Sequence, residues 1–243
     1  SVPDVARSAT FYSHLFQGGR LLGQKTPALR YEIDFHPGAL SIGPLRPSAA
    51  GESSHPFIDH FCVVARAFDG AAWRARLDEM KVRHFAGGSF VDIGGISVQL
   101  FGARQPRRRG KAPPGGGFEP MPPLYSGDPL VRPHGFEHVT LHVANLDAAA
   151  ARFHELFGLE SHAGASGEVS FRLGAIRLGL RQAGAGETPV IAAFAIKVAP
   201  FDPQHVAHAL EALGARVEPL EKSGRRTVLR FADPDGIRCS LRA

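Results

Sequence analysis

The run FEHVTLHVANLDAAAARFHELFGLE, residues 136–160, changes from an alternating to a helical pattern along its length. In its first part Val139, Leu141 and Val143 alternate with more polar residues that include His138 and His142. This alternation predicts a strand with one apolar and one polar face, and residues 146–157 are predicted to form the helix that follows.

A similar run opens the chain. Residue 1 laid on residue 142 aligns SVPDVARSATFYSHLF (1–16) with HVANLDAAAARFHELF (142–157). The same shift places the segment 92–100 on the segment 233–241. A single offset therefore aligns the beginnings and the ends of the two halves. The two halves are therefore internal repeats.

Each half also divides in two. A strand is predicted at 58–65 and another at 190–198, and each is followed by a helix, with Asp69 and Asp202 as the respective N-caps. Short alternating runs follow every helix. The count predicts four β-α-β-β-β units and an α+β fold class.

A segment rich in proline and glycine separates the halves. The predicted domains are 1–102 and 135–243, joined by a basic and Pro/Gly-rich linker at 103–134. Its basic residues have no aromatic interleaving and no recognition helix, which favours a linker over a nucleic-acid site. They are Arg104, Arg107, Arg108, Arg109 and Lys111.

Composition limits the class of protein. The chain has 243 residues, 44% of them hydrophobic and 21% charged, and a net charge of +5, which is typical of a globular protein. No run suggests a membrane span or a signal peptide. The sequence begins at Ser1 rather than Met, so localisation stays open, with the cytoplasm favoured over export. Cys62 and Cys239 cannot form a disulfide framework and are expected to be buried thiols.

Three segments together resemble the vicinal oxygen chelate superfamily, which includes glyoxalases, extradiol dioxygenases, methylmalonyl-CoA epimerases and bleomycin-resistance proteins. They are 136–160, DHFCVVARAFDGAAWRARLDEM (59–80) and FADPDGIRCSL (231–241). The resemblance implies that the four units form two tandem domains with cupped mixed sheets. Ligand or metal would lie inside the cup, with the helices packed outside.

The resemblance also implies metal ligands in the first cup. A metal of this superfamily is held by His, Glu or Gln from two opening strands and one final strand. His60 has an opening-strand position here and Gln99 a final-strand position, while the counterpart of His138 falls before Ser1. A divalent ion of Fe, Mn, Zn or Ni would suit such ligands.

Polar residues on a neighbouring strand could complete that site. In the run 30–36, Glu32, Asp34 and His36 alternate with apolar residues and share one face. We expect one of them to act as a proton-transfer base or as a further ligand.

The second cup lacks a ligand set. His138 has an opening-strand position, but the partner and final-strand positions hold Ala193 and Ser240, so no metal is expected there. An anionic ligand could bind instead. The predicted binding residues are His138, His142, Lys197 and Arg238.

These features lead to competing functions. The first is a metal-dependent enzyme, a lyase, isomerase or dioxygenase, acting in the first cup on a small substrate with vicinal oxygens. The alternative is a metal-free small-molecule binding (sequestration) protein of the bleomycin-resistance type. The repeat could also serve assembly, as in a homodimer. Neither nucleic acid nor a membrane is an expected partner.

Overall fold

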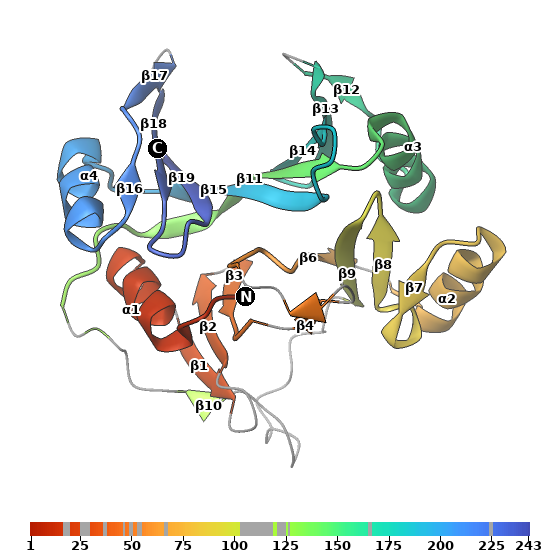
Figure 1. Ribbon diagram of the computed structural model, residues 1–243, viewed down its shortest axis with the longest axis horizontal. Coiled ribbons are helices and arrows are strands. Elements are labelled where there is room, and N and C mark those ends of the chain that lie inside the picture. Colours follow the sequence, from red (N-terminus) through yellow and green to blue (C-terminus); the bar gives the residue numbers. More distant parts are fainter. Residues whose placement is uncertain are drawn as a thin grey trace. The chain divides into compact units, whose positions relative to one another are not determined.

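A mixed α+β fold is formed by the residues that the computed structural model describes (Figure 1). These residues are 1–16, 20–24, 30–35, 38–45, 47–48, 51–52, 55–65, 68–102, 119–120, 125, 127–164, 167–223 and 226–243. The fold class agrees with the prediction. Within these ranges no helix is long and apolar enough to cross a membrane. The basic run 104–111 lies outside the described residues.

Every α-helix in the described ranges begins at a side-chain cap whose oxygen accepts hydrogen bonds from backbone N–H groups of the first turn. The caps are Asp4 for α1 (Val5–Leu15), Asp69 for α2 (Gly70–Glu79), Asn145 for α3 (Leu146–Phe157) and Asp202 for α4 (Pro203–Ala212). The predicted caps Asp69 and Asp202 are confirmed.

The chain folds into two compact units, and each draws on both halves of the sequence. Unit 1 comprises residues 1–57, 113–139 and 192–243, and unit 2 comprises 58–112 and 140–191. This grouping differs from the predicted tandem division into 1–102 and 135–243, which stays a prediction.

Unit 2 contains two groups of paired strands. One sheet has the order β6-β9-β8-β7, and the other group has the order β12-β13-β14-β11, of which the end of β11 belongs to this unit. The strands are β6 (His60–Ala65), β7 (His84–Phe85), β8 (Phe90–Ile93), β9 (Ile96–Gly102), β11 (Pro133–Val143), β12 (His162–Ala163), β13 (Val169–Leu173) and β14 (Ile176–Gln182). A short 3-10 turn, Ala86–Gly88, lies between β7 and β8.

Unit 1 contains the sheet β10-β1-β2-β3, the hairpin β4-β5, and the series β11-β15-β19-β18-β16, with β17 also paired to β18. Its strands are β1 (Arg20–Gln24), β2 (Arg30–Phe35), β3 (Gly38–Ile42), β4 (Pro47–Ser48), β5 (Gly51–Glu52), β10 (Glu119–Pro120), β15 (Val190–Val198), β16 (Arg216–Val217), β17 (Glu221–Ser223), β18 (Arg226–Ala232) and β19 (Arg238–Arg242).

The two halves of the sequence share a pattern of strand pairing. An opening strand pairs in parallel with a final strand in both β6–β9 and β15–β19, and Val2 makes a parallel bridge with Pro44. The turns that lead into β9 and β19 both place a glycine in the left-handed region, with φ +88° at Gly95 and +86° at Gly236. The shift between the halves therefore aligns equivalent backbone features.

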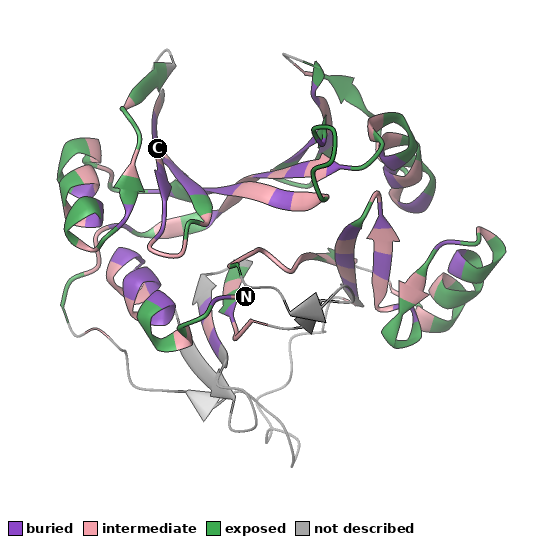
Figure 2. Cartoon of the chain, in the orientation of Figure 1, coloured by how far each residue is buried: buried purple, intermediate pink, exposed green. Residues whose placement is uncertain are grey.

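One face of each helix and strand supplies the core. The buried residues of α1 gather on one side of the helix (Figure 2). On β11 the predicted alternation is confirmed: Val139, Leu141 and Val143 are buried, whereas His138 and His142 are partly exposed. In unit 2, Val98 and Leu100 of β9 are buried, and so is Leu77 of α2.

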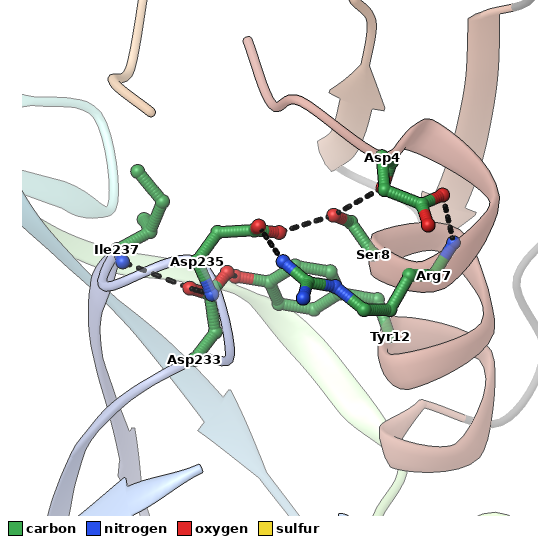
Figure 3. A network of polar contacts seen from close by, with 7 residues as sticks. All are labelled: Asp4, Arg7, Ser8, Tyr12, Asp233, Asp235 and Ile237. Atoms are coloured by element: carbon green, nitrogen blue, oxygen red, sulfur yellow. Dashed lines mark hydrogen bonds and ion pairs between the residues drawn. The ribbon is translucent and has the colours of Figure 1, made fainter. Parts of the chain in front are cut away.

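A buried carboxylate ties the turn 233–237 to α1 (Figure 3). Asp233 is only 4% exposed and accepts hydrogen bonds from the Tyr12 hydroxyl at 2.8 Å and from the backbone N–H groups of Asp235 and Ile237. Asp235 in turn contacts Ser8 and Arg7 on the same helix. Burial raises the pKa of Asp233 although these hydrogen bonds lower it. This network holds the last strand against α1.

Candidate functional site

Strands β6 and β9 bring three donor side chains to one face of the unit 2 sheet. Parallel pairing places His60 opposite Ser97 and Cys62 opposite Gln99. Paired residues on neighbouring strands share a face, and so do residues two apart on one strand. His60, Cys62 and Gln99 therefore lie on the same face.

The three side chains form a connected polar group. The Cys62 thiol donates a hydrogen bond to Gln99 Oε1 at 3.0 Å. His60 Nδ1 lies 2.9 Å from Asp59 Oδ2, so a ligand would bind the imidazole through Nε2. The Phe90 ring packs edge-on against the imidazole with centroids 5.1 Å apart and restricts its orientation.

The imidazole is strongly perturbed. Burial lowers the pKa of His60, but hydrogen bonds and charge from Asp59 and Cys62 outweigh it and raise the pKa from 6.5 to about 9. Such a shift in a group with a specific carboxylate partner marks a candidate functional site. A metal ion bound to this ring would have to displace its proton.

Cys62 is not a buried thiol, so that part of the cysteine prediction is wrong. Its side chain is exposed, whereas Cys239 is buried as expected. Cys62 stands two residues after His60 on β6 and so shares the open face of the strand. The run is apolar on both faces, which concealed the exposure of the thiol.

The donor set on β6 and β9 has few of the side chains that usually bind metals. No cluster of three or more His, Cys, Asp or Glu side chains in the described ranges could hold an ion. The set on β6 and β9 has only two donors of those types, His60 and Cys62, and its third donor is the Gln99 amide. Imidazole, thiolate and amide oxygen are nevertheless acceptable ligands for a borderline divalent ion.

The predicted base residues lie in unit 1. Glu32 is partly exposed on β2, where Tyr31 and Ile33 are buried as the alternation predicted. The side chain of Asp34 and the whole of His36 lie outside the described residues. His60 belongs to unit 2, so the role of Glu32, Asp34 or His36 as a base stays a prediction.

The equivalent strand pair in the second half carries no such donors. Ala195 pairs with Ser240 in the parallel register of β15 and β19, where the first half pairs Cys62 with Gln99. Ala195 is 2% exposed and Ser240 is 9% exposed. This face of the β15–β19 pair is therefore buried, and it lacks side chains that commonly bind metals.

A small cavity of about 260 Å³ lies in unit 1 beside this strand pair. It is lined by His134, Glu137, Lys197, Val198, Arg242 and Ala243, and Arg242 Nε forms an ion pair with Glu137 Oε2 at 3.4 Å. Of the predicted second-cup residues, Lys197 lines this cavity. His138 is partly exposed on β11, His142 belongs to unit 2, and Arg238 is exposed at the start of β19.

Comparison with known proteins gives matches among solved structures. No family model and no curated protein matches the chain. The 2,3-dioxygenase LapB from Pseudomonas sp. KL28 matches at TM-score 0.66 and 13% identity, covering 99% of this chain and 88% of that one. The Mn(II)-bound glyoxalase from Novosphingobium aromaticivorans matches at 0.63 and 16%, covering 99% and 78%. A 4-hydroxymandelate synthase mutant from Streptomyces coelicolor matches at 0.63 and 13%, covering 99% and 89%.

The chain has the vicinal oxygen chelate fold. The resemblance found in the sequence is thereby confirmed at the level of fold. Identities of 13% to 16% carry no residue roles, because one fold hosts many reactions. Within the vicinal oxygen chelate fold, function must be argued from His60, Cys62 and Gln99 themselves.

Proposed function

We propose that the chain is a metal-dependent enzyme of the glyoxalase or dioxygenase type, acting on a small substrate with two adjacent oxygens. One observation carries the proposal: β6 and β9 place His60 and Gln99 on a common open face, with Asp59 orienting the imidazole. A carboxylate on the second ring nitrogen is the usual support of a metal-bound histidine.

The chain's own residues would prepare the site in three ways. Asp59 holds one tautomer of His60, and the Phe90 ring limits rotation of the imidazole. The opposite face of β9 is buried through Val98 and Leu100, which keeps the strand rigid. A bound divalent ion would supply Lewis acidity to two vicinal oxygens of the substrate.

The test is metal content of the full chain after dialysis against metal-free buffer. We expect about one transition-metal ion per chain, and a loss of at least about 100-fold in affinity for His60→Ala, because removing a ligand costs more than removing an outer partner. His84→Ala is the matched control. His84 is likewise paired with an aspartate, with its Nε2 2.8 Å from Asp78 Oδ1. The side chains of His84 and His60 are similarly exposed, at 19% and 20%. Equal metal content in both variants would contradict the proposal.

A metal-free binding protein is the second candidate, and the cavity in unit 1 favours it. Among the side chains of the cavity lining, Arg242 pairs with Glu137, and Lys197 adds a second cation, so a small anion is the ligand it would take. Under this function the chain holds no metal, and Lys197→Ala removes the rise in unfolding midpoint that a bound carboxylate produces.

A further inference from the structure

The Cys62 thiol lies between His60 and Gln99 in the donor set. It donates a hydrogen bond to Gln99 Oε1 at 3.0 Å and stands two residues after His60 on the same face of β6. Because Cys62 is exposed on the open face of β6, an ion entering from solvent can reach it.

Charge balance makes the thiol important. His60 and Gln99 are both neutral when they bind an ion, so neither offsets the charge of a divalent cation. Asp59 contacts the Nδ1 side of the imidazole and is placed to orient it rather than to bind the ion. A thiolate at Cys62 would supply the missing negative charge within the set.

We propose that Cys62 is a metal ligand that completes a His60–Cys62–Gln99 set and makes it selective for Zn(II) over Mn(II). The inference rests on the proposed metal site and adds a ligand to it. Thiolate is a soft donor that suits Zn(II), whereas Mn(II) prefers oxygen donors. On binding, the thiol S–H bond is replaced by a sulfur–metal bond and one proton passes to solvent.

Co(II) replaces Zn(II) as a spectroscopic probe in the experiment. The full chain, Cys62→Ser and Cys239→Ala are titrated with Co(II), and absorption is recorded for d–d bands and for a sulfur-to-metal charge-transfer band. Cys239 is the matched control because it is the other thiol of the chain and is buried in β19. Circular dichroism and the unfolding midpoint confirm that each variant is folded, and Cys62→Gly serves if the serine variant is not.

We expect the charge-transfer band in the full chain and in Cys239→Ala but not in Cys62→Ser. The ratio of Zn(II) to Mn(II) affinity should fall at least about ten-fold in Cys62→Ser, since a soft ligand is lost. Zn(II) should also slow alkylation of Cys62 by iodoacetamide in the full chain.

Other results separate the two proposals. Co(II) binding that is equally tight in the full chain and in Cys62→Ser, with d–d bands and no charge-transfer band, would overturn the role of Cys62 and leave the metal site standing. Absence of Co(II) and Zn(II) binding in the folded full chain would overturn the metal site, and the role of Cys62 with it.

Discussion

The strand pairs β6–β9 and β15–β19 share the same parallel pairing. They differ in the exposure and in the side chains of the corresponding face. Where the first presents exposed Cys62 opposite Gln99, the second has buried Ala195 opposite Ser240. Val64, further along β6, is 62% exposed. The two pairs therefore differ in solvent exposure as well as in side-chain chemistry. The exposed face of β6–β9 carries donor side chains, and the buried face of β15–β19 carries small side chains.

The turns before the two final strands differ in the same sense. Asp233 is buried and accepts hydrogen bonds from Tyr12 and from two backbone N–H groups. Its counterpart Asp92 is partly exposed and accepts one hydrogen bond, from the backbone N–H of Gly95, and its Oδ2 lies 3.8 Å from Arg83 Nη1. The comparison suggests that the second strand pair contributes more to stability and the first more to binding.

The largest expected effect is on the free energy of unfolding, from a change in the turn before β19. Asp233→Ala leaves three donors without their acceptor, and we expect the free energy of unfolding to fall by about 3–5 kcal/mol, since each buried orphan costs about 1–3 kcal/mol. Asp92→Ala, the matched variant, should cost about 1 kcal/mol. Urea unfolding of both variants measures the difference. Equal losses would break the comparison.

An exchange of the final-strand residues should give the next largest effect. Ser240→Gln inserts a longer side chain at a position that is 9% exposed, and overpacking should cost about 1–3 kcal/mol of unfolding free energy. It should not create a metal site, because Ala193 and Ala195 offer no donors. Gln99→Ser should leave stability within about 1 kcal/mol and weaken Zn(II) binding. Metal titration beside urea unfolding checks both variants, and Zn(II) binding gained by Ser240→Gln would contradict the assignment of roles.

Local signals in the sequence predicted much of this fold. Asp69 and Asp202 were identified as caps because capping depends on the neighbouring backbone alone. Tyr31 and Ile33 were assigned to an apolar face because strand alternation is also local. The shift that places 92–100 on 233–241 added the correspondence of the two final strands.

Exposure of Cys62 could not be predicted in the same way. Its strand HFCVVA is apolar on both faces, and which face is covered depends on distant parts of the chain. The placement of His60 and Gln99 came from the resemblance, whereas the thiol between them is specific to this chain. The grouping of residues 1–57 with 192–243 in unit 1 likewise depends on long-range contacts, which the linker composition did not indicate.

A smaller and pH-dependent effect is expected for Asp233→Asn. The amide keeps an oxygen that can accept from the two backbone N–H groups. We therefore expect the substitution to lower the free energy of unfolding by about 1 kcal/mol at low pH, where its effect is greatest. Burial raises the folded-state pKa of Asp233 above 3.8, so the neutral carboxyl favours folding. That contribution is fully present below the unfolded value and is lost as pH rises through the folded value. The advantage of the native chain over Asp233→Asn should therefore shrink with rising pH, as urea unfolding across the acidic range would show. An advantage that grew with pH would contradict the raised pKa.

The smallest effect is expected where both strand pairs are exposed. Val64 on β6 and Lys197 on β15 occupy equivalent positions by the shift that aligns His60 with Ala193, and both are exposed. Exchange of the two, as Val64→Lys and Lys197→Val, should change the free energy of unfolding by less than about 0.5 kcal/mol each, because neither side chain fills a core position. Thermal and urea unfolding of the two variants measure this. A loss above about 1 kcal/mol for Val64→Lys would mean that something covers this face of β6, and the open face that distinguishes β6–β9 from β15–β19 would then have to be reassigned.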